Sequence, residues 1–228
     1  VRFEQRYDFR ISANAERLVK NALDLKLMDK LAGPRLFSEF RHICDEDNPM
    51  ACFVRMDQLR ILSAIAPQLA LIPTRKAILQ TLQDMLSWYR LLYFEKKPQT
   101  WLVYFLGLSH GLPYADTSDL YQRLGLPDNK RGEILSQREQ MRTVRGRLEA
   151  WQNQQNGQTP KVSALCGVLA PLSLESLLYL MAETGNEDLQ KKLSRYITQW
   201  QHEKADITGA DLKALGLPPG PLYSHILR

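Results

Sequence analysis

The chain has 228 residues, of which 44% are hydrophobic and 24% charged, so it can bury a sizeable core and needs no metal or disulfide to fold. Its three scattered cysteines, Cys44, Cys52 and Cys166, do not fit the framework of a disulfide-stapled secreted protein, and they favour a reducing, cytoplasmic compartment. No apolar run approaches the ~20 residues that a membrane-spanning helix needs, and the formal net charge of +5 suits a polyanionic partner or simply a solvated basic surface.

Apolar residues recur at helical spacing almost throughout, and the strict alternation of half-buried strands is nearly absent. We therefore predict an all-α, multi-helical fold, an irregular array of helical hairpins. The helices expected in the first part of the chain are 12–24 capped by Ser12, one opened by Gly33-Pro34, one opened by Asn48-Pro49, 73–94, and 99–108. Because 99–108 is apolar nearly all round, we expect it to be the most buried helix.

The second half of the sequence predicts further helices separated by clear breaks. They are 116–124, 128–154 opened by Asp128, 161–169, 174–184 capped by Ser173, 187–204 capped by Asn186, a short helix to 215 with a Thr208/Asp211 capping box, and a final helix through His225. The polar stretch 153–160 carries Gly157 and Pro160 and reads as a linker. We therefore divide the chain into 1–47, a helical body 48–154, and a C-terminal helical subdomain 161–228.

Four arginines on the expected 128–154 helix lie seven, four and three residues apart and share one face: Arg131, Arg138, Arg142 and Arg145. Beside them runs an apolar row that should dock the helix on the core: Ile134, Met141, Val144, Leu148 and Trp151. Such a cationic stripe can follow the phosphates of a nucleic acid without reading its sequence. The alternative is a solvated face, partly neutralised by Glu139 and Glu149.

A second cationic segment interleaves arginines with aromatic residues at the start of the chain: Arg2-Phe3, Arg6-Tyr7 and Phe9-Arg10. Charge combined with rings suits the unpaired end of an RNA. We expect Phe3 and Phe9 to belong to the core, which leaves Arg2, Arg6 and Arg10 as candidate RNA contacts.

The sequence contains no pattern that predicts catalysis within this chain. Gly-x-Ser-x-Gly, Walker-type, Gly-x-Gly-x-x-Gly and His-Glu-x-x-His motifs are all absent. His42, Cys44 and Cys52 lack a fourth partner for zinc, and the acidic run 45–47 is better explained as charge at a helix start than as a magnesium site. The glycine-containing segment 207–221 offers backbone N–H groups to an anion, although tight packing explains its composition equally well. We expect no catalytic and no metal-binding residue here.

Both ends of the chain resemble one family. Val1–Ile11 is similar to the segment that follows the Glu-Asp-x-x-Arg motif of class II tRNA nucleotidyltransferases, the group of CCA-adding enzymes, A-adding enzymes and bacterial poly(A) polymerases. Gly33–Phe40 resembles the family's later neck motif, Ser-x-Glu-Arg-hydrophobic-x-x-Glu-Leu, and keeps Arg35 and Glu39, while Gly33 and Pro34 replace the serine and glutamate. The segment 207–221 resembles the tail element of longer bacterial members.

The resemblance implies a neck (1–47), a body and a tail that hold tRNA or another RNA for a catalytic head domain located upstream. ATP and magnesium would bind in that head, so we expect no cofactor in this chain and no activity without the head. No catalytic or nucleotide-selecting residue of the family can be placed on this sequence. The competing interpretation is a helical protein-interaction scaffold without RNA binding, in which the stripe meets an acidic protein.

Overall fold

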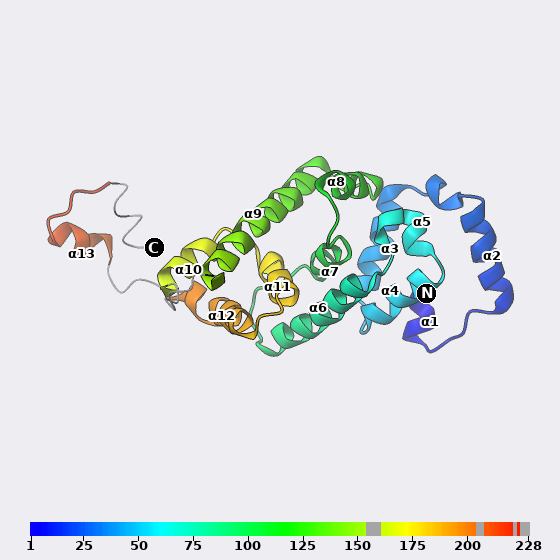
Figure 1. Ribbon diagram of the computed structural model, residues 1–228, viewed down its shortest axis with the longest axis horizontal. Helices are drawn as coiled ribbons and strands as arrows, with labels where there is room; N and C mark the ends of the chain where they lie inside the picture. The colour runs from blue at the N-terminus through cyan, green and yellow to red at the C-terminus, as the bar shows by residue number, and fades with distance from the viewer. Residues whose placement is uncertain (154–160, 204–207, 221–222, 224–228) are drawn as a thin grey trace.

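The computed structural model describes residues 1–153, 161–203, 208–220 and 223. Within those residues the chain forms α-helices and short 3-10 turns and no strand, which confirms the predicted all-α fold. The helices are joined by short loops into an elongated, multi-helical array (Figure 1).

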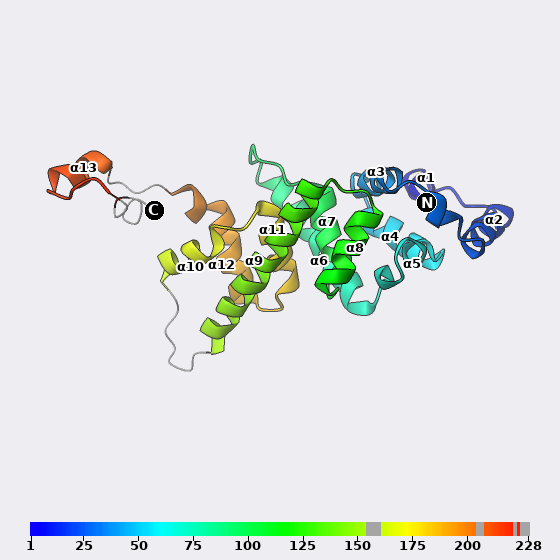
Figure 2. The same ribbon diagram turned by 90° about the horizontal axis from the view of Figure 1, so that it is seen from above.

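In chain order the elements are α1 (Arg2–Arg6), α2 (Ala13–Asp24), η1 (Leu27–Lys30), α3 (Gly33–Cys44), α4 (Pro49–Gln58), α5 (Ile61–Ile65), η2 (Pro67–Leu69), α6 (Pro73–Leu91), α7 (Thr100–Leu108), α8 (Tyr114–Arg123), α9 (Asp128–Asn153), α10 (Val162–Leu169), α11 (Leu174–Glu183), α12 (Glu187–Thr198), η3 (Trp200–His202) and α13 (Gly209–Ala214). Two views at right angles place α1 to α5 at one end and α10 to α12 toward the other, with α6 and α9 running between them (Figures 1 and 2).

Most helix starts are capped by the side chains that the sequence indicates. Ser12 Oγ accepts a hydrogen bond from the Ala15 amide, and the predicted caps Asn48, Ser173 and Asn186 act in the same way. Thr208 and Asp211 form the expected capping box at the start of α13. The expected final helix falls on residues that lie mostly outside the described part of the chain.

The centre of the molecule is built around α7, which packs against α3, α6 and α11. Eight of its nine residues are buried, as its apolar composition predicts. The prediction that it is the most buried helix holds only in part, because nine of the ten residues of α11 are also buried. The buried residues of α11 include Glu175, whose carboxylate accepts a hydrogen bond from the Gln99 amide at the start of α7 (2.8 Å).

One continuous hydrophobic core runs through the described chain. It extends from Phe40 in α3 to Ile197 in α12, and so it joins helices on both sides of the expected linker. Residues 154–160 of that linker lie outside the described residues. The division into 1–47, 48–154 and 161–228 therefore stays a prediction, and the core includes residues of all three segments, from Phe40 to Ile197.

Three helix boundaries differ from the expected ones by two residues or more. Helix α6 ends at Leu91 and not at residue 94, because Tyr93 adopts a left-handed backbone conformation (φ +54°). Helix α8 begins at Tyr114, two residues early, because Pro113 supplies the N-cap backbone and its carbonyl accepts bonds from the amide and hydroxyl of Thr117. Helix α12 ends at Thr198, where Gln199 leaves helical geometry (φ −131°, ψ −69°) and the chain turns so that Trp200 packs on the core.

The start of α3 lies unusually close to the turn after α8. A Cβ atom on Gly33 would lie 2.4 Å from the carbonyl oxygen of Arg123, so no larger residue fits without moving backbone. On the other side, Gly125 adopts φ +68° and faces the ring of Pro34. This contact explains why residue 33 is a glycine.

No single helix in the described residues is long and apolar enough to cross a membrane. Helices α10 and α11 reach that length and composition only together, and they are bent by 114° relative to each other. The burial of α11 in the protein core accounts for its apolar composition.

Candidate nucleic-acid interface

Helix α9 packs on the core through the apolar row that the sequence indicates. Ile134, Met141, Val144 and Leu148 are buried, and Trp151 is partly buried against the same core. The four predicted arginines therefore lie along the edges of this contact. They differ in how far their charges are engaged by the protein itself.

Arg131 and Arg142 form ion pairs within α9. Arg131 Nη2 lies 2.8 Å from Asp128 Oδ1, and Arg142 Nη2 lies 3.3 Å from Glu139 Oε2. The Arg142 side chain is 73% exposed. Exposed pairs of this kind contribute little to stability, so Arg142 can exchange its carboxylate for a phosphate at small cost.

Arg138 is used mainly to hold the turn between α7 and α8. Its Nη1 donates to the hydroxyl of Ser109 (2.9 Å) and to the Ser109 carbonyl (3.3 Å), and its Nη2 donates to the Leu112 carbonyl (3.2 Å). Because several of its donors are occupied, Arg138 forms part of the floor of the site and has fewer hydrogen bonds left for a ligand than Arg142.

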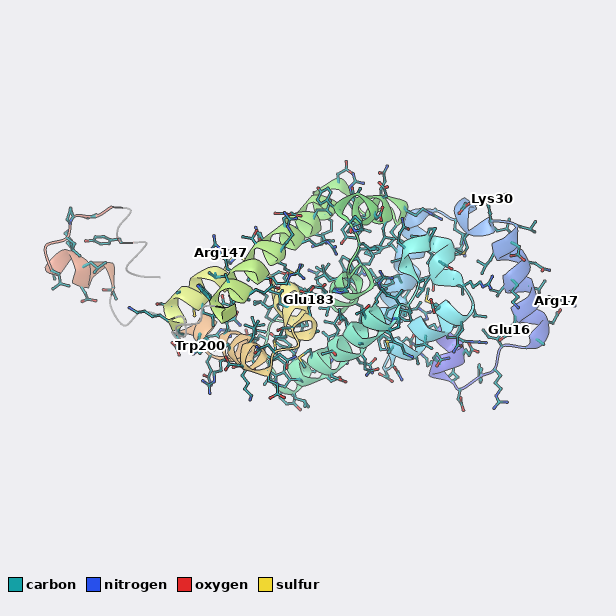
Figure 3. The ribbon with its side chains drawn as sticks, in the orientation of Figure 1. Glu16, Arg17, Lys30, Arg147, Glu183 and Trp200 are labelled. Carbon is teal, nitrogen blue, oxygen red and sulfur yellow. The ribbon has the colours of Figure 1, made fainter. Side chains whose placement is uncertain are left out.

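Arg145 belongs to a polar network that joins α9 to α11. Its Nη1 lies 2.6 Å from Glu183 Oε1, and the hydroxyl of Tyr179 donates to the same oxygen at 3.2 Å. His110 Nδ1 lies 2.7 Å from the Tyr179 hydroxyl. Figure 3 shows Glu183 on the inner side of α9, toward α11, whereas Arg147 lies on the outer side.

The protein environment keeps both rings of this network uncharged. Burial raises the pKa of Tyr179, and the nearby Glu183 carboxylate acts in the same direction. Burial also lowers the pKa of His110 from its ordinary value of 6.5, and this effect outweighs the opposing influence of Glu183. Arg75, Arg145 and Arg138 lower the pKa of His110 further. His110 is therefore neutral at physiological pH.

A groove of about 370 Å³ opens over these groups. Its lining comes from the turn after α7, from α9 and from α11, and includes His110, Tyr114, Arg138, Arg142, Arg145, Tyr179 and Glu183. Three of the four arginines predicted on this face thus line one concave surface. Arg131, nearer the start of α9, is not among the lining residues.

The N-terminal arginines are placed differently. Arg6 donates to both carboxylate oxygens of Glu46, at 2.8 and 2.6 Å, and Arg2 Nε lies 3.4 Å from the same carboxylate. The hydrogen bond to Glu46 is the main reason why the pKa of Arg6 is raised. These contacts fix α1 on the end of α3, whereas Arg10 is exposed and makes no ion pair with any described residue.

The expectation that Phe3 and Phe9 are core residues is wrong. They are 54% and 64% exposed, and together with Tyr7 they form an exposed stack with ring centroids 6.1 and 5.4 Å apart. Helix α1 is only five residues long and is held by ion pairs, so no ring needs to be buried to dock it. Helix α1 and the groove on α9 lie in different parts of the molecule, and the predicted arginines therefore do not share one surface (Figures 1 and 2).

Sequence reasoning missed the partners that shape both regions. Glu46, Glu183, Tyr179 and His110 stand in no recognisable motif and are brought together from separate helices. The one available signal was the i, i+4 spacing of Tyr179 and Glu183, two polar residues at the end of a very apolar helix.

The soft and acidic residues weighed as metal ligands have other roles. Cys44 and Cys52 are buried in the core, His42 is exposed, and Glu46 of the acidic run is engaged by arginines. Residues 1–153, 161–203, 208–220 and 223 contain no group of three or more His, Cys, Asp or Glu side chains placed to hold a metal ion. The anion site considered in 207–221 overlaps residues outside the described chain and stays a prediction.

Comparisons with known proteins match the whole chain. An A-adding tRNA nucleotidyltransferase of Geobacter sulfurreducens is 37% identical over 230 aligned positions, which cover 100% of this chain and 26% of that protein. An A-adding tRNA nucleotidyltransferase of Aquifex aeolicus is 22% identical over 211 positions, covering 90% of this chain and 23% of that protein. No protein-family model matches.

Solved structures show the same fold. The structure of a Thermotoga maritima CCA-adding enzyme complexed with tRNA matches 99% of this chain and 52% of that one, with a TM-score of 0.78 and 22% identity. A CCA-adding enzyme with ATP matches 99% of this chain and 51% of that one, with a TM-score of 0.77 and 22% identity. The chain spans about a quarter of the length of these two curated relatives, and along 90 to 100% of its own length it is homologous to A-adding tRNA nucleotidyltransferases.

Proposed function

We propose that this chain is the RNA-positioning part of a tRNA nucleotidyltransferase or poly(A) polymerase-like enzyme that acts in tRNA 3′-end processing. The observation that carries the proposal is the 37% identity to an A-adding enzyme along the entire chain. In this role the helices orient the RNA 3′ end, and orientation alone can remove a large part of the entropic barrier of a reaction.

The basic residues on and beside the groove support binding to the RNA backbone. Arg142 is largely exposed, Arg145 lies at the rim, and Arg147 is exposed on the other side of α9. Each phosphate that such side chains neutralise releases counterions, so binding of this kind depends steeply on salt and little on sequence. Helix α9 is rigidly docked, which holds these charges in fixed register along 26 residues.

A salt titration tests the proposal. The double variant Arg142→Ala/Arg147→Ala should bind tRNA more weakly, and the slope of log affinity against log salt should become shallower by about 1.5, since each contact contributes ~0.7 to 0.9. The matched control is Lys76→Ala/Arg90→Ala, which removes two exposed charges from α6 and should change the slope little. Equal effects of the two double variants would show that only net charge matters and would overturn the proposal.

Catalysis in this proposal is supplied by a head domain of the same protein, which binds ATP and magnesium in the cytoplasm. Exposed apolar side chains near the start of the chain support the docking of another domain there: Phe3, Tyr7, Phe9, Leu18, Leu25, Leu27 and Leu31. This chain alone, incubated with tRNA, ATP and magnesium, should give no 3′ extension. Extension by the purified chain would contradict the proposal.

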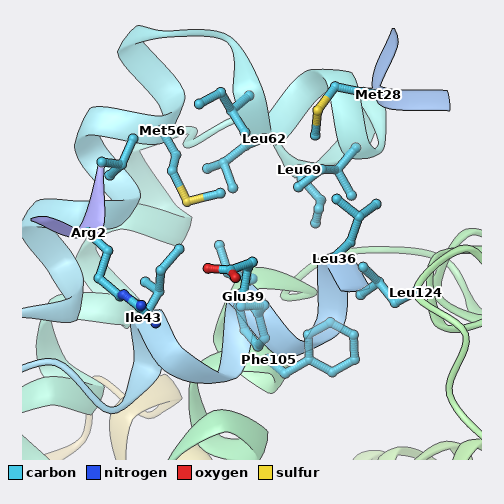
Figure 4. Close-up of a pocket in the computed structure, with 15 residues that line it drawn as sticks. Arg2, Met28, Leu36, Glu39, Ile43, Met56, Leu62, Leu69, Phe105 and Leu124 are labelled. Atoms are coloured by element: carbon cyan, nitrogen blue, oxygen red, sulfur yellow. The ribbon is translucent and has the colours of Figure 1, made fainter. Parts of the chain in front are cut away.

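The same apolar end favours a second candidate function, a scaffold that binds proteins. Close to it lies an apolar cavity of about 230 Å³ between α3, α5 and α7, with Glu39 and Arg2 as its polar groups (Figure 4). If the chain fails to bind tRNA even at low salt, and a protein partner protects Arg142 and Arg145 from chemical modification, the scaffold is the better explanation.

A further inference from the structure

We propose that the groove between α9 and α11 recognises the 2′-hydroxyl of a ribose, so that it selects RNA over nucleic acids that lack this donor. The inference rests on the proposed function, because it assumes that an RNA strand lies along α9. It adds a specificity element made by Glu183 and His110, which the phosphate contacts alone cannot supply.

The first step of the argument is that Glu183 has a free acceptor. All polar contacts of this carboxylate with described residues are made by its Oε1 atom, and they come from Arg145, Tyr179 and His110. Its Oε2 atom makes no hydrogen bond to any described residue. The Glu183 side chain is only 13% exposed, so this free oxygen lies in a partly desolvated site.

The second step is the protonation of His110. The Tyr179 hydroxyl has one proton, which it donates to Glu183. The close contact between His110 Nδ1 and the Tyr179 oxygen then requires the proton of the neutral imidazole to lie on Nδ1. His110 Nε2 is left as an acceptor, and it makes no hydrogen bond to the described residues. The groove is therefore lined by two free acceptors, Glu183 Oε2 and His110 Nε2.

The third step is that these acceptors are accessible. Among the described residues, the buried side-chain nitrogens and oxygens without a partner are Arg2 Nε, Arg75 Nε and Tyr121 Oη. Neither Glu183 Oε2 nor His110 Nε2 belongs to that group, so solvent reaches both. A volume of about 370 Å³ lies within the range of small-ligand sites, and it suits one nucleotide unit.

Two acceptors that line the same groove as arginines favour a ligand that carries a donor close to a phosphate. Arg142 and Arg145 attract the phosphate, while a carboxylate and a neutral imidazole can bind only a donor. The 2′-hydroxyl is the donor that every RNA residue carries close to its phosphate, and it is the group by which proteins distinguish RNA from DNA. The hydroxyl has one proton, so it donates either to Glu183 or to His110, and a sugar without it pairs with neither acceptor, which lowers affinity.

The test compares an RNA hairpin with the same hairpin in which every 2′-hydroxyl is replaced by fluorine. Fluorine preserves the A-form sugar geometry but cannot donate a hydrogen bond. The wild-type chain should bind the hydroxyl form about fivefold to tenfold more tightly, the ratio that one hydrogen bond of ~1 to 1.4 kcal/mol gives. Fluorescence anisotropy at a fixed salt concentration measures both affinities.

The variants separate this inference from the proposed function. In Glu183→Ala and in Glu183→Gln/His110→Phe the ratio of the two affinities should fall toward one, even where both affinities rise because Arg145 is released. In Arg142→Ala both affinities should fall and the ratio should stay. Equal binding of the two hairpins by the wild type, or an unchanged ratio in the Glu183 variants, would overturn the inference while leaving RNA binding intact.

A second measurement does not depend on polymer binding. The His110 ring signal, identified with His110→Gln, should shift when AMP is added and shift much less with the 2′-fluoro analogue. If neither hairpin binds, the proposed function fails, and the AMP titration still decides whether the groove senses the hydroxyl. The same shift for both nucleotides, or none for either, would refute the 2′-hydroxyl site.

Discussion

Replacing Glu183 with glutamine should strengthen binding of the 2′-fluoro RNA hairpin, which cannot donate to the proposed hydroxyl site, although Glu183 touches three residues of that site. The reason is competition. Arg145 Nη1 lies 2.6 Å from Glu183 Oε1, so a phosphate can be bound by Arg145 only after this pair is broken. The glutamine keeps the carbonyl oxygen as an acceptor for Tyr179 but removes the negative charge that holds Arg145 and repels the phosphate.

The size of the effect follows from the exposure of the pair. Arg145 is 46% exposed and Glu183 is 13% exposed, so the pair lies between a solvated and a buried one. Exposed pairs are worth up to ~1 kcal/mol, and 1.4 kcal/mol corresponds to a tenfold change in affinity. We therefore expect affinity for the 2′-fluoro hairpin to rise about threefold to tenfold at roughly 0.1 M salt, and the gain to shrink as added salt screens the charges.

Fluorescence anisotropy with the 2′-fluoro hairpin measures the affinity of four proteins: the wild type, Glu183→Gln, Arg145→Ala and the double variant. If Arg145 is the residue released, the glutamine substitution should have less than about a twofold effect in the Arg145→Ala background, because the two changes are then coupled. A loss of affinity in Glu183→Gln, or an equal gain in both backgrounds, would refute the reasoning.

Three further predictions concern stability. Gly33→Ala should destabilise the fold by roughly 1 to 3 kcal/mol, because the added Cβ meets the Arg123 carbonyl. Gly146→Ala, which has open space around it in α9, should stabilise the fold by about 0.5 to 1 kcal/mol. Urea unfolding of both variants measures the two changes in unfolding free energy. Arg75→Met should lower the free energy of unfolding by roughly 2 to 4 kcal/mol in the same assay, since three backbone carbonyls lose their hydrogen-bond donor. Because the pKa of His110 is lower in the folded chain than its ordinary 6.5, the unfolding free energy should fall as pH decreases through 6.5, and His110→Gln should flatten that dependence.

Local sequence signals predicted the helices well. Periodicity and capping residues such as Ser12, Asn48 and Ser173 act within one helix, so they can be read without knowing the tertiary structure. The boundaries that moved, after Leu91, at Tyr114 and after Thr198, depend on how a loop packs, which is a property of the whole fold. The same limit applies to Phe3 and Phe9, whose exposure is decided by what holds α1.

The candidate site was predictable only in part. The face shared by Arg138, Arg142 and Arg145 follows from helical geometry and was identified. The acceptors opposite it come from α11 and from the turn after α7, and no spacing in the sequence relates Glu183 to His110. Long-range partners of this kind are fixed by packing.

The arrangement of arginines explains why counting positive charges cannot identify the RNA contacts. Arg75, only 3% exposed, donates to the carbonyls of Gln68, Ala70 and His110, and Arg138 donates to Ser109 and Leu112. Two arginines from α6 and α9 therefore hold the turn that carries His110 from both sides. A site held in this way is organised before a ligand arrives, so binding need not order the loop. Loss of Arg75 should then weaken recognition by the groove, although Arg75 lies too deep to touch RNA.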